Sequence, residues 1–264
     1  MSQILSKEFI KRLINDVKYI KNNPLDSNGI YYLHDEDDLM TGYALIIGPT
    51  NTVYENGYYF FKFTFTPQYP HEPPIVKYLT NGGNVRFNPN LYTDGKVCIS
   101  MLNTWTGEQW TSCQNISSIL LTLCTLFNEN PFLNEPDIKS DNKEIPCYNK
   151  LIEYANFDIA ICDVINTKSH LHNLETTFIP LFYDVILEHF TNNYQNHLSK
   201  INLLIDNCKT KSKTETVHVR AYGYYGKLNY KSLLTKMIHT FKLINNDIND
   251  TIDTNDINDT IDTI

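Results

Sequence analysis

The stretch Asn88–Trp110, NPNLYTDGKVCISMLNTWTGEQW, joins an Asn-Pro-Asn segment to a cysteine through a glycine-containing turn. Cys98 follows Asn90 by eight residues, which is long enough for a turn that brings the two side chains together. A free cysteine in a folded protein is often only a small buried apolar residue. The stretch therefore raises two questions: which fold surrounds it, and whether Cys98 packs or reacts.

The residues before this stretch are typical of β-structure. The runs TGYALIIGP (Thr41–Pro49) and GYYFFKFTFTP (Gly57–Pro67) are rich in β-branched and aromatic residues and are bounded by Gly and Pro. Four prolines between residues 67 and 74 then interrupt any regular ladder. We predict an antiparallel meander of about four strands over residues 30–79.

Helical spacing flanks the meander on both sides. Apolar residues recur at three- and four-residue steps over residues 5–20, which predicts an amphipathic first helix with a basic outer face. The same spacing returns after Trp110, with Asn115 as the expected N-cap, and again over residues 148–162, from about Pro180, and over 228–243. A helix, a meander, a long loop and further helices describe an α+β domain with a helical C-terminal extension.

Composition narrows the possible functions. The chain has 264 residues and a net charge of −8, so no general basic field is present to bind a nucleic-acid backbone. The N-terminal residues mix charged with apolar side chains, unlike a signal peptide, and no apolar run approaches the roughly 20 residues that span a bilayer. Six cysteines without a CxxC pair indicate reduced thiols. We expect a cytoplasmic or nuclear protein that binds neither nucleic acid nor membrane.

The last residues differ in kind from the rest of the chain. NDINDTIDT at Asn246–Thr254 recurs unchanged at Asn255–Thr263. The repeat is acidic and has no aromatic residue, which predicts a disordered tail. An acidic tail that docks on a partner is the alternative that the pattern leaves open.

Six motifs occur in an order and spacing that resemble the ubiquitin-conjugating enzymes. They are GPTNTVYENG (Gly48–Gly57), YPHEPP (Tyr69–Pro74), NPN (Asn88–Asn90), GKVCIS (Gly95–Ser100), a following Trp, and ENPFLNEP (Glu129–Pro136). The inserted TWTG and the RFNPN sequence resemble the large Z-type members of that family. The resemblance implies a ubiquitin-conjugating (UBC) fold, with a conjugating core at 1–166, a helical extension at 167–245 and the disordered acidic tail at 246–264.

The resemblance also implies a chemistry. A cysteine of the family accepts the carboxyl terminus of ubiquitin or a ubiquitin-like modifier from an activating enzyme as a thioester, and a substrate lysine or a ligase then takes it. Cys98 matches that nucleophile, which must be accessible on rigid backbone because the thiolate attacks. Cys124 and Cys162, on apolar helical stripes, are expected to pack. No cofactor is expected, because the activating enzyme consumes the ATP.

Two further residues match catalytic positions of the family. Asn90 matches the asparagine that steadies the carbonyl oxygen during transfer, as a pre-placed amide donor can; a turn residue that bonds its own loop is the alternative. Glu135 matches the acidic residue near the incoming lysine, which orients the amine; an ordinary surface glutamate is the alternative. Asn88 stands where most members have histidine, a change that Z-type members share.

Partner surfaces follow from the same resemblance. The first helix contacts the activating enzyme in the family, so Lys7, Lys11 and Arg12 are candidates for that contact, with a solvated helix face as the alternative. The ligase-facing loops depart from the small enzymes. His71 stands in place of an aromatic residue, and Ser112 and Cys113 replace a Pro-Ala pair.

Two other functions compete with conjugation. A non-catalytic binding module of the same fold would present or regulate ubiquitin, but such variants lack the nucleophile, which Cys98 supplies. A cysteine hydrolase would need a histidine base beside the thiol, and none of the eight histidines lies in a recognisable Cys/His signature. No Cys/His cluster has zinc-ligand spacing and no glycine-rich phosphate loop is present, so neither metal nor nucleotide is expected.

Overall fold

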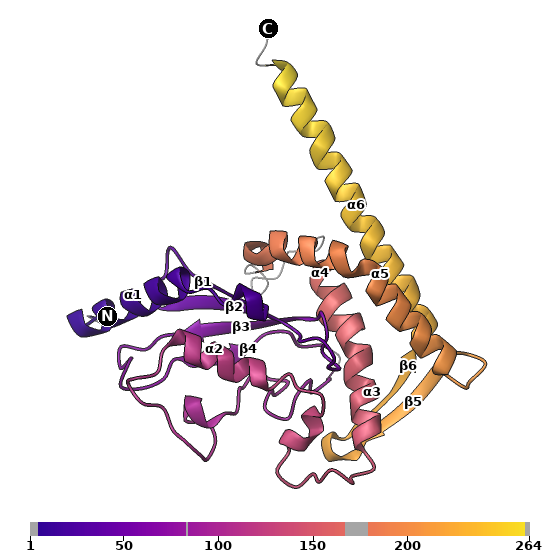
Figure 1. The fold of residues 1–264 in the computed structure, drawn as a ribbon, viewed down its shortest axis with the longest axis horizontal. Helices are drawn as coiled ribbons and strands as arrows, with labels where there is room; N and C mark the ends of the chain where they lie inside the picture. The colour runs from indigo at the N-terminus through magenta and orange to yellow at the C-terminus, as the bar shows by residue number, and fades with distance from the viewer. Residues whose placement is uncertain (1–4, 83, 167–178, 262–264) are drawn as a thin grey trace.

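A computed structural model describes residues 5–82, 84–166 and 179–261 (Figure 1). The first helix, the four strands and the helices after them follow in the predicted order. The elements are α1 (Lys7–Asn22), β1 (Ile30–His34), β2 (Thr41–Ile47), β3 (Tyr58–Thr64), β4 (Ile75–Tyr78), α2 (Ile116–Thr125), α3 (Ile145–Ala155), α4 (Val164–Asn166), α5 (Tyr183–Asn207), β5 (Thr214–Val219), β6 (Tyr224–Asn229) and α6 (Tyr230–Ile261). This order confirms the α+β class, with the predicted first helix, meander and later helices.

Helix α1 begins at a polar cap. The Ser6 hydroxyl accepts a hydrogen bond from the Phe9 amide at 3.0 Å, which satisfies one of the free donors at the helix start. Phe9, Leu13 and Ile20 are buried along the face that packs on the core. The helix ends at Asn22, just before Pro24, which cannot continue it.

The meander forms one antiparallel sheet in the order β1-β2-β3-β4, as predicted. Phe61 pairs with Ala44 and Phe63 with Gly42, and both phenylalanines belong to the main core together with residues of α2 and α3. The alternate residues of β3, Tyr58 and Phe60, are equally buried. Burial of both sets shows that both faces of β3 are covered.

A second core covers the other face of the sheet. Tyr58 and Phe60 pack there with residues of the extension, among them Phe190 of α5 and Met237 of α6. Figure 1 shows α5 lying across the sheet on the side away from α2. The extension is therefore fixed to the sheet through a core of its own rather than joined by a free linker.

Helices α2 and α3 follow the meander and the long loop after it. Asn115 caps α2 as predicted: its side-chain oxygen accepts from the Ser118 amide at 3.0 Å, and the Ser118 hydroxyl accepts from the Asn115 amide at 2.9 Å. Helix α3 continues as a π-helix over Asn156–Asp163. The buried side chain of Asn156 accepts from the Tyr59 hydroxyl at 2.6 Å, which ties this turn to the sheet.

The extension contains a hairpin that we did not predict. Strands β5 and β6 pair over six residues each, and Val217, Val219 and Leu228 are buried on one face. A short turn closes the hairpin, with Gly223 in the left-handed region at φ 60. Leu228, which we expected in the last helix, belongs to β6, and α6 begins at Tyr230. The glycine between two alternating runs was a usable hairpin signal.

The repeat also differs from the expectation. Helix α6 runs to Ile261, so it continues through most of the segment predicted as a disordered tail, and Figure 1 shows its far part, in yellow, leading away from the other elements. A helix that has already formed adds one hydrogen bond for each further residue, so a packed start supports its continuation. The predicted boundary at residue 167 lies outside the described residues, and the three-part division stays a prediction. No helix in the described ranges is both long and apolar enough to cross a bilayer.

Candidate active site

The loop between β4 and α2 is built around the buried side chain of Asn88. Its amide donates to the Leu126 carbonyl at 2.8 Å and to the Tyr54 hydroxyl at 3.1 Å, and its oxygen accepts from the Asn90 amide at 2.9 Å. These three bonds join the loop to the end of α2 and to the core. The residue that replaces the family's histidine is therefore a structural link, and neutral at any physiological pH.

Cys98 and Asn90 lie side by side, as the turn between them predicted. The Cys98 amide donates to the Asn90 carbonyl at 2.8 Å, and the Asn90 side-chain amide donates to the Cys98 carbonyl at 2.7 Å. The Asn90 donor is thus held beside the nucleophile's own backbone. Both expected roles of Asn90 remain compatible with this geometry, because the amide bonds its loop and stays next to the candidate nucleophile.

The Cys98 thiol is less open than we expected. The residue is 4% exposed, and its Sγ donates to the Thr104 carbonyl at 3.1 Å. Thr104 begins the inserted TWTG segment, and its hydroxyl accepts from the Ile99 amide at 2.9 Å and lies 2.9 Å from the Val97 carbonyl. The insertion, folded back by these bonds, covers the sulfur.

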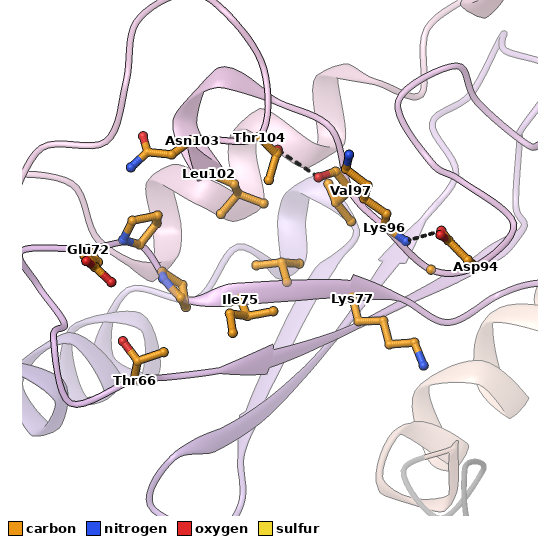
Figure 2. Close-up of a pocket in the computed structure, with 14 residues that line it drawn as sticks. Thr66, Glu72, Ile75, Lys77, Asp94, Lys96, Val97, Leu102, Asn103 and Thr104 are labelled. Carbon is orange, nitrogen blue, oxygen red and sulfur yellow. Dashed lines mark hydrogen bonds between the residues drawn. The ribbon is translucent and has the colours of Figure 1, made fainter.

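A cavity of about 680 Å³ lies between β4 and the segment that carries Cys98, although Cys98 itself does not line it. Val97, which precedes Cys98, and Thr104, which bonds its sulfur, line the cavity together with Leu102 and the strand residue Ile75. Figure 2 shows Thr104 reaching back to Val97 across the loop, and Ile75 on the opposite wall formed by β4. Thr104 therefore contacts both the Cys98 sulfur, through its carbonyl, and the cavity.

Glu135 follows the short 3-10 helix η3 (Pro131–Asn134) and is already engaged. Its carboxylate accepts a hydrogen bond at 2.7 Å from the Tyr222 hydroxyl, which comes from the tip of the β5–β6 hairpin. Burial and this bond raise the pKa of Tyr222, so the phenol stays a donor. The family role predicted for Glu135 stays a prediction, but the residue is not an isolated surface glutamate.

The basic face of α1 is smaller than predicted. Arg12 donates to the carbonyls of Ser112 and Gln114 at 2.6 and 2.5 Å and pairs with Asp16 at 2.7 Å, so its guanidinium binds within the fold. Arg12 makes these bonds because it lies where α1 meets the loop before α2. Lys7 and Lys11 are exposed, and their contact with an activating enzyme stays a prediction.

The predicted ligase-facing residues gather near that same junction. His71, Ser112 and Cys113 are exposed; the His71 ring lies 3.5 Å from Glu8, and the Ser112 hydroxyl donates to the Pro70 carbonyl at 3.1 Å. Trp110 also donates to the Pro70 carbonyl, at 2.7 Å, and is buried. The loops at 70–71 and 110–113 thus form one continuous surface, whose partner stays a prediction.

The two cysteines that we expected to pack are buried or half-buried. Cys162 is fully buried, and burial raises the pKa of its thiol to about 12, which leaves it protonated. Burial also raises the pKa of the half-buried Cys124. Both fit the predicted packing role. Among the residues that the structure describes, no group of three or more His, Cys, Asp or Glu side chains could hold a metal ion.

Sequence reasoning missed two residues beside the site. Arg86 stacks on the Tyr92 ring with its guanidinium carbon 3.8 Å from the ring centre, and it also lies 4.7 Å from the centre of the Tyr222 ring. Arg86 stands just before the Asn-Pro-Asn segment, which was a usable signal. Tyr222 is 134 positions from Asn88, and nothing in the local pattern points to the loop.

An N-terminal helix, a four-stranded meander and a cysteine that follows an Asn-x-Asn loop before α2 define the ubiquitin-conjugating fold. The sequence model of the family described as "Ubiquitin-conjugating enzyme" matches residues 12–151. The chain therefore belongs to the ubiquitin-conjugating enzyme family.

Individual relatives agree with the Z-type resemblance. A protein of Danio rerio named ubiquitin-conjugating enzyme E2 Z is 40% identical over 166 residues, which cover 62% of this chain and 50% of the relative. One of the same name from Xenopus tropicalis is 32% identical over 241 residues, 80% of this chain and 76% of the relative. The chain thus spans about half the length of the Danio rerio relative.

The solved structure of human ubiquitin-conjugating enzyme E2 G1 matches at 27% identity and a TM-score of 0.41, over 47% of this chain and 98% of that one.

Proposed function

We propose that this chain is a ubiquitin-conjugating enzyme that carries ubiquitin or a ubiquitin-like modifier as a thioester on Cys98. The observation that carries the proposal is the pairing of Cys98 with the Asn90 side-chain amide, 2.7 Å from the nucleophile's own carbonyl, in the family's loop. A non-catalytic module would need neither this sulfur nor a donor held beside it.

The first step is a thioester exchange. The Cys98 thiolate attacks the modifier's C-terminal carbonyl on the activating enzyme, a new sulfur–carbon bond forms, and the activating enzyme's cysteine leaves as a thiolate. ATP is consumed earlier, by the activating enzyme, so this chain needs no cofactor for the exchange. The inserted segment must first move, because its Thr104 carbonyl is hydrogen-bonded to the Cys98 sulfur and lies over it.

The second step is aminolysis. A neutral lysine amine forms the carbon–nitrogen bond, the carbon–sulfur bond breaks and the Cys98 sulfur leaves as a thiolate, and the proton lost by the nitrogen passes to that thiolate or to water. Negative charge develops on the carbonyl oxygen, and an amide donor placed there lowers the barrier. We assign that donor to Asn90 Nδ2, which would exchange the Cys98 carbonyl for the developing oxyanion. A ligase cysteine can replace the lysine as acceptor.

The partners follow from these two steps. The chain would bind the modifier and an activating enzyme, with Lys7 and Lys11 of α1 facing the latter, and a ligase or substrate near His71, Ser112 and Cys113. These residues are exposed, as a docking surface requires. We place the reaction in the cytoplasm or nucleus, where thiols stay reduced.

A charging assay tests the proposal. The purified chain is incubated with ubiquitin, ATP and each of several activating enzymes, and the products are run on a gel without reductant. We expect a band that a thiol reductant removes, that becomes resistant to reductant in Cys98→Ser and that is lost in Cys98→Ala. Cys147→Ser, on α3, is the matched control and should charge normally. Absence of the band with every activating enzyme would favour the binding module.

A further inference from the structure

The tip of the β5–β6 hairpin lies against the conjugating core at a fixed point. Its turn covers Arg220–Tyr222 and is closed by Gly223. The Glu144 carboxylate, just before α3, accepts from the Arg220 amide at 3.0 Å. Figure 1 shows the hairpin running beside α3. The extension therefore presents the last residue of the turn, Tyr222, to the core in a defined position.

Tyr222 contacts the segment around η3 through both its ring and its hydroxyl. The hydroxyl donates to Glu135 at 2.7 Å. The ring packs edge-on against Phe132, with centroids 5.8 Å apart, and Phe132 in turn stacks on Tyr148 at 4.6 Å. Because a hydrogen bond to a carboxylate is stronger than one between neutral groups, this contact fixes Glu135 as well as the backbone that carries it.

One route leads from this segment to the nucleophile. Asn134, the residue before Glu135, lies 3.4 Å from the Asn88 side-chain oxygen. That oxygen accepts from the Asn90 amide, and the Asn90 side chain donates to the Cys98 carbonyl. Each hydrogen bond in this series joins one polar group to the next, so a shift of η3 changes the orientation of Asn90.

A second route is independent of the first. The Arg86 guanidinium lies between the rings of Tyr222 and Tyr92, 4.7 and 3.8 Å from their centres, and also donates to the Pro89 carbonyl. Pro89 and Tyr92 flank Asn90 in the sequence. An arginine stacked on an aromatic ring is held in orientation by the face of that ring. Tyr222 therefore supports the loop from two sides.

We propose that Tyr222 is a positioning residue for transfer from Cys98: the C-terminal extension uses it to hold Glu135 and the Asn90 loop in place around the thioester. The inference rests on the proposed function. In discharge to free lysine, the groups around the thioester come from this chain alone, and small misplacements are costly because the reacting atoms must be aligned. The role therefore belongs mainly to transfer and much less to charging.

The test compares Tyr222→Phe with Tyr225→Phe in the full chain. Tyr225 lies in the same hairpin and is 70% exposed, so the same removal of a hydroxyl at this position is a matched control. Each variant is charged with ubiquitin, the charging is stopped, and decay of the thioester is followed over a range of free lysine concentrations. We expect normal charging and a maximal discharge rate about fivefold lower in Tyr222→Phe, the effect of one lost hydrogen bond on a barrier. Tyr225→Phe should match the unaltered chain.

A double-variant cycle distinguishes positioning from a structural role. If Tyr222 acts through Glu135, the Tyr222→Phe change should slow discharge much less in a Glu135→Ala background than in the unaltered chain. A residue that only stabilises the fold would give effects that add in the two backgrounds and would lower charging together with discharge. Additive effects would therefore overturn the proposal.

The remaining outcomes separate this inference from its premise. If the unaltered chain charges and both Tyr222→Phe, which loses the hydroxyl, and Tyr222→Leu, which also loses the ring, discharge at the unaltered rate, Tyr222 has no positioning role and the proposed function stands. If the unaltered chain takes no thioester from any activating enzyme, the proposed function itself is wrong. The phenylalanine variant keeps the ring contacts with Phe132 and Arg86, so it tests the hydroxyl without removing the packing that folds the hairpin.

Discussion

The loop from Asn88 to Thr104 and the second core between the sheet and α5 are held in different ways. In the loop, hydrogen bonds to side chains fix the backbone, as Asn88, Asn90 and Thr104 each bond a carbonyl or amide of another residue. In the second core, aromatic and aliphatic side chains such as Phe190 fill space with few polar contacts. A hydrogen-bonded loop can change locally, whereas a packed core gives way as a unit. The part that carries the proposed nucleophile is thus the adjustable one.

The largest expected effect tests the packed side of this comparison. Phe190 is buried in α5 against His197 and Phe241, so Phe190→Ala should remove about 3 to 5 kcal/mol from the free energy of unfolding. Urea unfolding followed by circular dichroism measures the loss. Leu203→Ala, in the same helix at 59% exposure, is the control and should stay within about 0.5 kcal/mol of the unaltered chain. A loss below about 1 kcal/mol for Phe190→Ala would show that the extension does not depend on this core.

The next effect concerns the buried histidine of the second core. His197 is fully buried, neither ring nitrogen has a hydrogen-bond partner among the described residues, and burial lowers its pKa to about 4. The folded chain therefore holds the ring neutral, while the unfolded chain takes up a proton below about pH 6.5. Stability should be intact above that pH and fall by about 3 kcal/mol as the pH drops to about 4.

Unfolding measured across that pH range checks the prediction. His197→Phe should remove this part of the pH dependence, because it has no proton to gain. His239→Gln changes an exposed histidine and should leave the dependence unaltered. If the free energy of unfolding changes with pH at the same slope in the unaltered chain and in His197→Phe, His197 does not contribute and other groups set the response to acid.

The smallest expected effect tests the adjustable side. Thr104→Ala removes the hydroxyl that bonds the Ile99 amide and the Val97 carbonyl, so the insertion should lift from Cys98 more often. If the covered state of Cys98 loses about 1 kcal/mol of stability, alkylation of Cys98 should be about fivefold faster. Mass spectrometry of the labelled peptides measures the rate, and Thr111→Ala, at an exposed position in the following loop, is the control. An unchanged rate would show that the hydroxyl does not keep the sulfur covered.

The sequence predicted most of what local patterns determine. The meander, α1 and the capped start of α2 follow from alternation, helical spacing and Asn115, and the proximity of Asn90 to Cys98 follows from the turn between them. The β5–β6 hairpin was missed because the helical spacing around it was given more weight than Gly223. The repeat was assigned from composition, which carries no information on whether a preceding helix continues.

The contacts that sequence could not supply join distant parts of the chain. Arg12 also pairs with Asp16 in the same helix, but two of its three partners, the carbonyls of Ser112 and Gln114, lie about a hundred positions away. Backbone carbonyls leave no mark in a sequence, so these two contacts could not be predicted. The bond between Tyr222 and Glu135 has the same character. The covered state of Cys98 depends on a carbonyl of the insertion, so the motif around the cysteine predicted an open thiol.

The covered sulfur has a practical consequence for chemical probes. Cys113 is exposed and Cys98 is 4% exposed, so a cysteine-directed electrophile or peroxide reaches Cys113 first. A covalent fragment screen scored by intact mass would therefore select compounds that modify the chain without touching Cys98. Site-resolved detection would identify the molecules that can displace the insertion, whereas Cys113→Ser alone would not, because Cys124 and Cys147 are also partly exposed.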